Sequence, residues 1–210
     1  MKVQDVIDMA AYGELRDLGL RNDVPTVLSY INLGLLELYK RFSLSTKEIV
    51  IELQNNVEIY DMPVDYMWIV AAYGEVPINS TDTINSLPIN VENNPVSINT
   101  INWYQVQIPN SIEGARVSLI YVAKPDMLIY NEATPDTLLQ NELPLPDQLI
   151  EALLSYMAYR AYGTINNENQ SESNVFYRKF EEASKRVKRD GVLTSDDLTM
   201  KTRIKTRGFV

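Results

Sequence analysis

Four carboxylates in the first third of the chain are its best candidates for acid–base chemistry. A pair of carboxylates can hydrolyse a glycosidic bond without any histidine. Here, however, the surrounding residues alternate between apolar and polar types, which predicts strands whose carboxylates point to solvent. We therefore interpret these residues as a solvated face, and we predict no catalytic residue and no enzyme. The four are Glu48, Glu52, Glu58 and Asp61.

The sequence also lacks the side chains that most often bind metals or activate nucleophiles. It contains no histidine and no cysteine, which removes the commonest general base and every thiolate site. It has no glycine-rich phosphate loop, no G-x-S-x-G elbow and no H-E-x-x-H pair. We accordingly expect no cofactor and no metal ion.

The C-terminal end differs from the rest of the chain in charge. The net charge is −9, yet residues 178–210 contain ten Lys/Arg and five Asp/Glu and so carry +5. Basic residues alternate with others there, so an extended strand would place four of them on one face. This alternation favours an arm that docks on a partner as a strand; a solvated end and a nucleic-acid arm are the alternatives. The candidate docking residues are Lys201, Arg203, Ile204, Lys205, Arg207 and Phe209.

Aromatic residues offer a second kind of candidate surface. Tyr156, Tyr159 and Tyr162 step by three along one predicted helix. Tyrosine is enriched at protein interfaces, so these three form a candidate subunit interface, with packing between helices of one chain as the simpler alternative. Trp68 and Trp103 fall in predicted strands, and we expect them in the core.

Helical periodicity appears at both ends of the sequence. Apolar residues recur at helical spacing over residues 3–18 and 23–43, and again over 143–163 and 174–191. Gly19 and Gly191 suit helix ends, and Asp23 suits a helix start. The chain therefore predicts two helices before its middle and two after it.

Between these helices the period of the sequence changes to two. Strands are predicted at 46–54, 57–63, 67–78, 103–109 and 115–125, joined by turn residues. Residues 79–100 are rich in Asn, Ser, Thr and Pro and predict a long loop or a ragged edge hairpin. The middle of the chain thus predicts a small antiparallel β-sandwich or barrel.

The fold class expected from these elements is α+β. Two N-terminal and two C-terminal helices would form an antiparallel four-helix frame, with the small β domain inserted and an extended C-terminal arm. The expected boundaries are 1–44 with 142–190 for the helical domain, 45–141 for the β domain and 191–210 for the arm. No apolar run approaches the ~18 residues of a membrane-spanning helix, and acids occupy the first residues where a signal peptide would be apolar. We therefore expect synthesis in the cytosol and no membrane partner.

The order of these stretches resembles a known family. "VPTVLSYINLGLLELYKRF" has a central Ile-Asn, and "NVEIYDMPVDYMWIV" places a tyrosine and a proline before an apolar strand. "WYQVQIP" and "ARVSLIYVAKP" follow as a strand pair, and "LPLPDQLIEALLSYMAYRAYG" and "NVFYRKFEEASKRVKRDGV" follow as two helices. Together they are similar to the head-to-tail adaptor (head completion or connector) family of short-tailed bacteriophages.

The resemblance implies a structural virion protein at the head–tail interface. Such adaptors form an oligomeric ring, commonly of twelve copies, between the portal and the tail nozzle, tail tube or tail fibre proteins. The helical domain would form the ring wall, the arm would bind the portal, and double-stranded DNA would cross the lumen during ejection without being read. The loop at 79–100 has no counterpart in this resemblance.

An alternative function is a carbohydrate- or protein-binding β module carried on a helical stalk. This alternative requires an exposed aromatic patch on the β domain. The residues to examine for such a patch are Tyr66, Trp68, Tyr73 and Tyr104, although the alternating pattern buries at least some of them.

Overall fold

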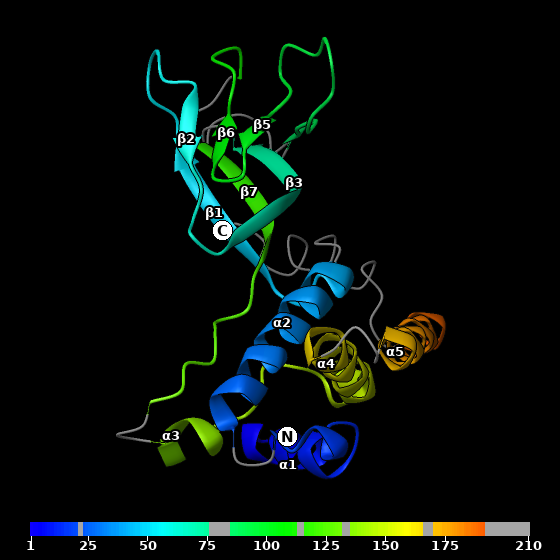
Figure 1. Cartoon of the computed structure of the whole chain (residues 1–210). Helices are drawn as coiled ribbons and strands as arrows, with labels where there is room; N and C mark the ends of the chain where they lie inside the picture. Colours follow the sequence, from blue (N-terminus) through cyan, green and yellow to red (C-terminus); the bar gives the residue numbers. More distant parts are fainter. Residues whose placement is uncertain (21–22, 76–84, 113–115, 132–134, 166–169, 192–210) are drawn as a thin grey trace. The chain divides into compact units, whose positions relative to one another are not determined.

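The computed structural model describes residues 1–20, 23–75, 85–112, 116–131, 135–165 and 170–191 (Figure 1). The chain mixes helices with two antiparallel sheets, as expected for the α+β class. It divides into two compact units, a helical unit of residues 1–42 with 125–210 and a β unit of residues 43–124. The antiparallel four-helix frame and the closed sandwich or barrel stay predictions.

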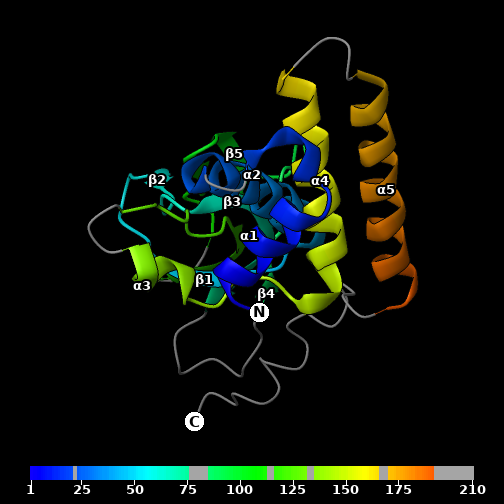
Figure 2. The same ribbon diagram turned by 60° about the horizontal axis from the view of Figure 1, so that its bottom comes forward.

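The helical unit is arranged around α4. This helix packs against α5 along its length, and also against α2 and α1 (Figures 1 and 2). The core between them contains Ile31, Leu35, Leu153, Met157 and Phe180, all fully buried. The helices described are α1 (Val3–Tyr12), α2 (Val24–Phe42), α3 (Pro135–Leu139), α4 (Ile150–Ile165) and α5 (Gln170–Arg189).

The predicted helix at 3–18 is too long. α1 ends at Tyr12, because Gly13 has a non-helical backbone (φ −102, ψ −109). The amide of Leu15 then donates to the carbonyl of Ala10 at 2.9 Å, and this wider turn keeps Leu15 buried. A short 3-10 helix, Arg16–Leu18, follows and ends at Gly19 with φ +64. The break allows the chain to keep Leu15 in the core while it turns away from α1.

The β unit consists of two sheets that share one hydrophobic core. Its central strand β7 lies between β1 and β3 and pairs antiparallel with each of them. Val117 and Leu119 of β7 pack in one cluster with Val106 of the smaller sheet. The larger sheet contains, in order, β1 (Thr46–Glu52), β7 (Arg116–Ala123), β3 (Tyr66–Glu75) and β4 (Asn85–Ser86); the smaller contains β2 (Ile59–Asp61), β6 (Gln105–Gln107) and β5 (Asn99–Asn102).

The strand predicted at 103–109 begins two residues later, at Gln105. The expectation that Trp103 lies in a strand and in the core is therefore wrong. Trp103 lies in the turn between β5 and β6, and 80% of it is exposed. The amide of Tyr104 donates to the side-chain oxygen of Asn102 at 3.0 Å, which is an Asx turn that ends the strand. The polar stretch at 79–100 also contributes strand residues, namely β4 and the start of β5.

Gly34 allows α2 and α4 to approach each other closely. It is buried in the face of α2 that packs on α4. A Cβ atom at this position would lie 2.4 Å from Cδ1 of Leu153 and 3.5 Å from Cδ1 of Tyr156. Leu153 is itself fully buried, so it has little room to move away.

Replacing Gly34 with Val should therefore destabilise the protein. We expect Gly34→Val to lower the free energy of unfolding by about 3 kcal/mol, the upper range for an overpacked core. Gly34→Ala should cost less, because the gain in helix propensity of about 1 kcal/mol offsets part of the clash. Urea unfolding measures both changes, and Lys40→Ala on the exposed side of α2 is the control. A Gly34→Val protein as stable as the unmodified chain would contradict this packing.

Candidate functional surfaces

The carboxylates considered for catalysis each have a separate partner. Arg116 lies 3.3 Å from Glu52, Gln107 donates to Glu58 at 3.1 Å, and Gln105 donates to Asp61 at 2.9 Å, while Ser118 donates to Glu48. In the part of the chain that the structure describes, no group of three or more acidic side chains is placed to hold a metal ion. These contacts assign the carboxylates a role in strand pairing.

The candidate arm residues, Lys201 to Phe209, lie outside the described residues. The structure instead describes the helix that leads to them. α5 ends with the amide of Asp190 bonded to the carbonyl of Arg186 at 2.9 Å, followed by Gly191 with φ +66. Its last turn carries Arg186, Lys188 and Arg189. The way in which α5 is fixed to the rest of the unit therefore decides where the arm begins.

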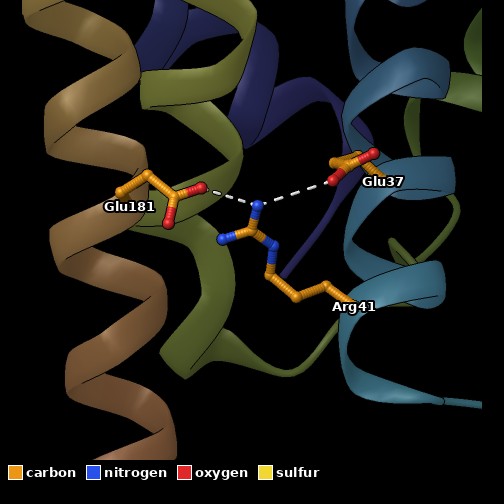
Figure 3. Close-up of polar contacts among 3 residues, drawn as sticks. All are labelled: Glu37, Arg41 and Glu181. Atoms are coloured by element: carbon orange, nitrogen blue, oxygen red, sulfur yellow. Dashed lines mark hydrogen bonds and ion pairs between the residues drawn. The ribbon is translucent and has the colours of Figure 1, made fainter.

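An ion pair joins α5 to α2 (Figure 3). Nη2 of Arg41 lies 2.7 Å from Oε1 of Glu181 on α5 and 3.6 Å from Oε1 of Glu37, one turn earlier on α2. The guanidinium also lies over the ring of Phe180, 4.5 Å from its centroid. Only 21% of the Arg41 side chain is exposed, so solvent screens this contact weakly.

The charges of this junction stabilise each other. The hydrogen bond from Arg41 lowers the pKa of Glu181, and the same bond raises the pKa of Arg41. Both shifts favour the charged pair in the folded protein. Arg41 thus fixes α5 by a charge-assisted hydrogen bond on one side and by stacking on an aromatic ring on the other.

The three tyrosines of α4 contact aromatic rings of α5 in the same chain. Ring centroids are 5.1 Å apart for Tyr156 and Phe180, and 5.1 Å apart for Tyr159 and Tyr177. Tyr162 is buried and stacks on Phe176 at 5.2 Å. Their spacing of three is accounted for by this row of contacts between α4 and α5. A role of these tyrosines at a subunit interface stays a prediction.

Trp103 is a surface residue, although the alternating pattern of the sequence predicted it in a strand. Its ring packs edge-to-face on Tyr104, with centroids 4.9 Å apart. A chain of hydrogen bonds fixes the turn below it: Asn102 donates to Gln105 at 2.9 Å, and Gln105 donates to Asp61 at 2.9 Å. An asparagine directly before the two aromatic residues was the sequence signal for such a turn. The result is a large exposed aromatic side chain on a rigid support.

The sequence as a whole is similar to a known protein family. A family model described as SU10 adaptor protein matches residues 1–203. No curated protein matches the chain. Among the helices that the structure describes, none combines the length and the apolar character needed to cross a membrane.

The Arg41–Glu181 pair should make stability depend on pH. Because the folded protein holds the pKa of Glu181 below its ordinary value of 4.5, its contribution is present above about pH 4.5 and is lost as the pH falls through the lowered value. We expect Glu181→Gln to cost about 1.5–3 kcal/mol at pH 7, the range for a hydrogen bond to a charged group. Urea unfolding between pH 3 and 7 should show this difference shrinking at the acid end.

The matched control is Glu182→Gln, because Glu182 is the next residue of α5 and is exposed. This substitution should change stability little at any pH. A difference between the unmodified chain and Glu181→Gln that stays constant from pH 7 to pH 3 would show that the carboxylate charge is not what fixes α5.

Proposed function

The chain belongs to the SU10 adaptor protein family, and on that premise we propose that it joins the portal of a bacteriophage head to the tail. Membership of this family supports a role as a structural adaptor protein of a phage. We extend this to a ring of copies, commonly twelve in such adaptors, that sits in the virion between the portal and the tail nozzle, tail tube or tail fibre proteins. The ring would continue the channel through which DNA leaves the head.

The observation that carries this proposal is the rigid attachment of α5. Arg41 and the aromatic row between α4 and α5 fix the helix on the helical unit. The residues that follow α5 form the basic arm of the sequence, from Gly191 to Val210. When the first residues of an arm are held in place, less conformational entropy is lost as the arm binds an acidic partner. Its affinity for that partner is therefore higher. We assign the portal as that partner.

The distribution of charge suits a DNA channel. Residues 1–177 contain nine Lys/Arg and twenty-three Asp/Glu, a net charge of −14. Such a surface repels phosphates and gives DNA few sites at which to bind during its passage. In this proposal residues 1–44 and 142–190 form the ring wall, and residues 45–141 face the tail proteins.

A second candidate function is favoured by the exposed aromatic pair. A carbohydrate- or protein-binding β module needs an exposed aromatic patch, and of the four residues considered for it one, Tyr104, is exposed. Tyr66 is buried, and Trp68 and Tyr73 are half-buried. Tyr104 is exposed beside Trp103, so the patch sits at the β5–β6 turn. In an adaptor this turn would dock on a tail protein; in a free-standing module it would bind a glycan or another protein.

Removal of the arm tests the adaptor function. We expect a chain lacking residues 191–210 to keep its fold, since the described helices supply the core, and to add no ring beneath the portal. Electron microscopy of the portal protein of the same phage, mixed with full-length or truncated chain, measures the added density. Density added equally by both forms would contradict the role of the arm.

A charge variant separates the electrostatic part of this docking. Replacement of Lys201, Arg203, Lys205 and Arg207 by Gln should weaken portal binding most at low salt, where charges are least screened. If portal binding by the unmodified chain does not change with salt concentration, this electrostatic explanation is excluded. Absence of added density with the unmodified chain would contradict the adaptor function and favour the binding module.

Trp103 should matter for binding and not for folding. Because its side chain is largely exposed, Trp103→Ala should change the free energy of unfolding by no more than about 0.5 kcal/mol. We expect at least a tenfold loss of affinity for tail proteins of the same phage, about 1.4 kcal/mol or more, as for an aromatic hot spot. Val50→Ala, which also removes exposed apolar surface from the β unit, is the control. Unchanged affinity in Trp103→Ala would show that this turn is not a docking point.

A further inference from the structure

A stretch of extended chain beside α2 is fixed by one asparagine. Residues 125–131 run without helical turns towards α3 (Figure 1). The side-chain amide of Asn32 on α2 donates to the carbonyl of Leu128 at 2.9 Å, and its oxygen accepts from the amide of Leu128 at 2.9 Å. Asn32 thereby satisfies both backbone groups of Leu128, as a neighbouring strand would.

This bonding leaves one edge of the extended segment open. In an extended chain the backbone groups of successive residues point to opposite edges. Those of Leu128 face α2, so those of Met127 and Ile129 face away from it, and within the described residues neither makes a hydrogen bond to the chain. Their side chains are 73% and 76% exposed. Two large apolar side chains and four backbone groups are therefore presented outwards.

Exposed leucines of α2 extend this apolar surface. Leu36 follows Asn32 by one helical turn on the same face, and Leu33 lies beside it; both are exposed. The segment runs towards α3, which lies near the N-terminal end of α2, so it is antiparallel to α2 (Figure 1). The four exposed apolar residues thus belong to two neighbouring antiparallel stretches of chain. We call this surface the α2 flank: Leu33, Leu36, Met127 and Ile129.

The outward face of α5 has a different character. α5 packs mainly on α4 and meets α2 at Arg41, so its outward face is turned away from α4 (Figure 2). Exposed residues of α5 recur there at helical spacing, from Val175 through Arg178 and Glu182 to Lys185. We call this row the α5 stripe. It combines an exposed valine with the long alkyl stems of basic side chains, which can cover apolar surface.

α5 differs in charge from the rest of the helical unit. Residues 170–189 of α5 contain six Lys/Arg and three Asp/Glu, a net charge of +3, whereas residues 1–42 and 125–165 contain six Lys/Arg and twelve Asp/Glu, a net charge of −6. Two copies joined by identical faces would bring like charges together. A contact between α5 of one copy and the acidic remainder of the helical unit of the next brings opposite charges together, and such head-to-tail contacts generate rings where the rotation closes.

We propose that the α2 flank of one copy packs against the α5 stripe of a second copy, and that this contact repeats around the ring. The inference rests on the proposed function and names the surfaces that would build its ring wall. Packing would remove the exposed side chains of Met127 and Ile129 from water. It would also give the open edge at these residues partners from the second copy.

The absence of cysteine from the chain makes the contact directly testable. Each engineered cysteine is unique, so we would combine Ile129→Cys with one cysteine on the α5 stripe, at Val175, Arg178, Glu182 or Lys185. A short bis-maleimide added to the portal-bound protein should link at least one of these double variants into a ladder of covalent oligomers. Each single variant should give dimers at most. Ile129→Cys combined with Val50→Cys on the β unit is the matched control.

A second measurement uses cooperativity as its readout. Contacts between neighbours make binding to the portal all-or-none, so mass photometry during titration should show empty and fully occupied portals with few intermediates. Met127→Asp with Ile129→Asp should bind as independent copies, with partial occupancy at every concentration. Met127→Leu with Ile129→Val should restore the cooperative pattern. Val64→Asp, at an exposed position of the β unit, should leave it unchanged.

The outcomes separate this inference from the function on which it rests. A full ring on the portal without any cross-linked ladder, or cooperative binding by the doubly acidic variant, would overturn the contact and leave the adaptor function standing. Cross-links from Ile129→Cys to the portal protein alone would assign the α2 flank to the portal and also overturn the contact. Failure of the unmodified chain to bind the portal would contradict the adaptor function itself.

Discussion

The helical unit depends on the close approach of α2 and α4 at Gly34. These helices come from opposite ends of the chain, and more than one hundred residues separate Gly34 from Leu153, the side chain that occupies its missing Cβ position. Closure of a long loop costs chain entropy, although this cost grows only slowly with loop length. The packing of the two helices must offset this entropy before the N-terminal and C-terminal helices can form one core.

The β unit makes this long-range closure feasible. Its first strand β1 pairs with its last strand β7, with Thr46 opposite Val122, and the amide of Ala123 donates to the carbonyl of Ser45 at 2.8 Å. The two ends of the β unit therefore lie side by side. Once β1 and β7 have paired, the unit behaves as a short connection between α2 and the segment that leads to α3, and α4 can find its place on α2. An insertion with distant ends would oppose the same closure.

Strongly periodic helices could be predicted from the sequence, and details of side-chain contact could not. The stretch predicted at 23–43 forms α2 at Val24–Phe42, because its apolar positions recur over five turns and Asp23 accepts from the amide of Thr26 at 3.2 Å. The stretch predicted at 174–191 forms α5, which begins four residues earlier at Gln170. α3, with five residues, has too few positions to show a period.

The strands show where a period of two is not sufficient. Alternation located β1 and β7 closely, but it also counted Trp103 and Tyr104 as strand residues, because a turn of two aromatic residues continues the same apolar pattern. The order β1-β7-β3-β4 pairs strands that are distant in sequence, and no local pattern records such a choice. The candidate surfaces share this difficulty: Asn32 and Leu128 are 96 residues apart, so nothing near either residue announces the contact.

The contacts of these two residues nevertheless explain the central Ile-Asn pair of the α2 sequence. Ile31 is fully buried in the helical core, whereas the Asn32 side chain is directed at the backbone of Leu128. Asparagine is a poor residue for a helix interior, and an apolar residue here would lose both hydrogen bonds. Aspartate would present two acceptors to a carbonyl. Only an amide supplies one donor and one acceptor in the geometry that a strand would offer. Asn32 therefore fixes the segment in which Met127 and Ile129 are exposed, and the proposed contact with a second copy would use the segment in this position.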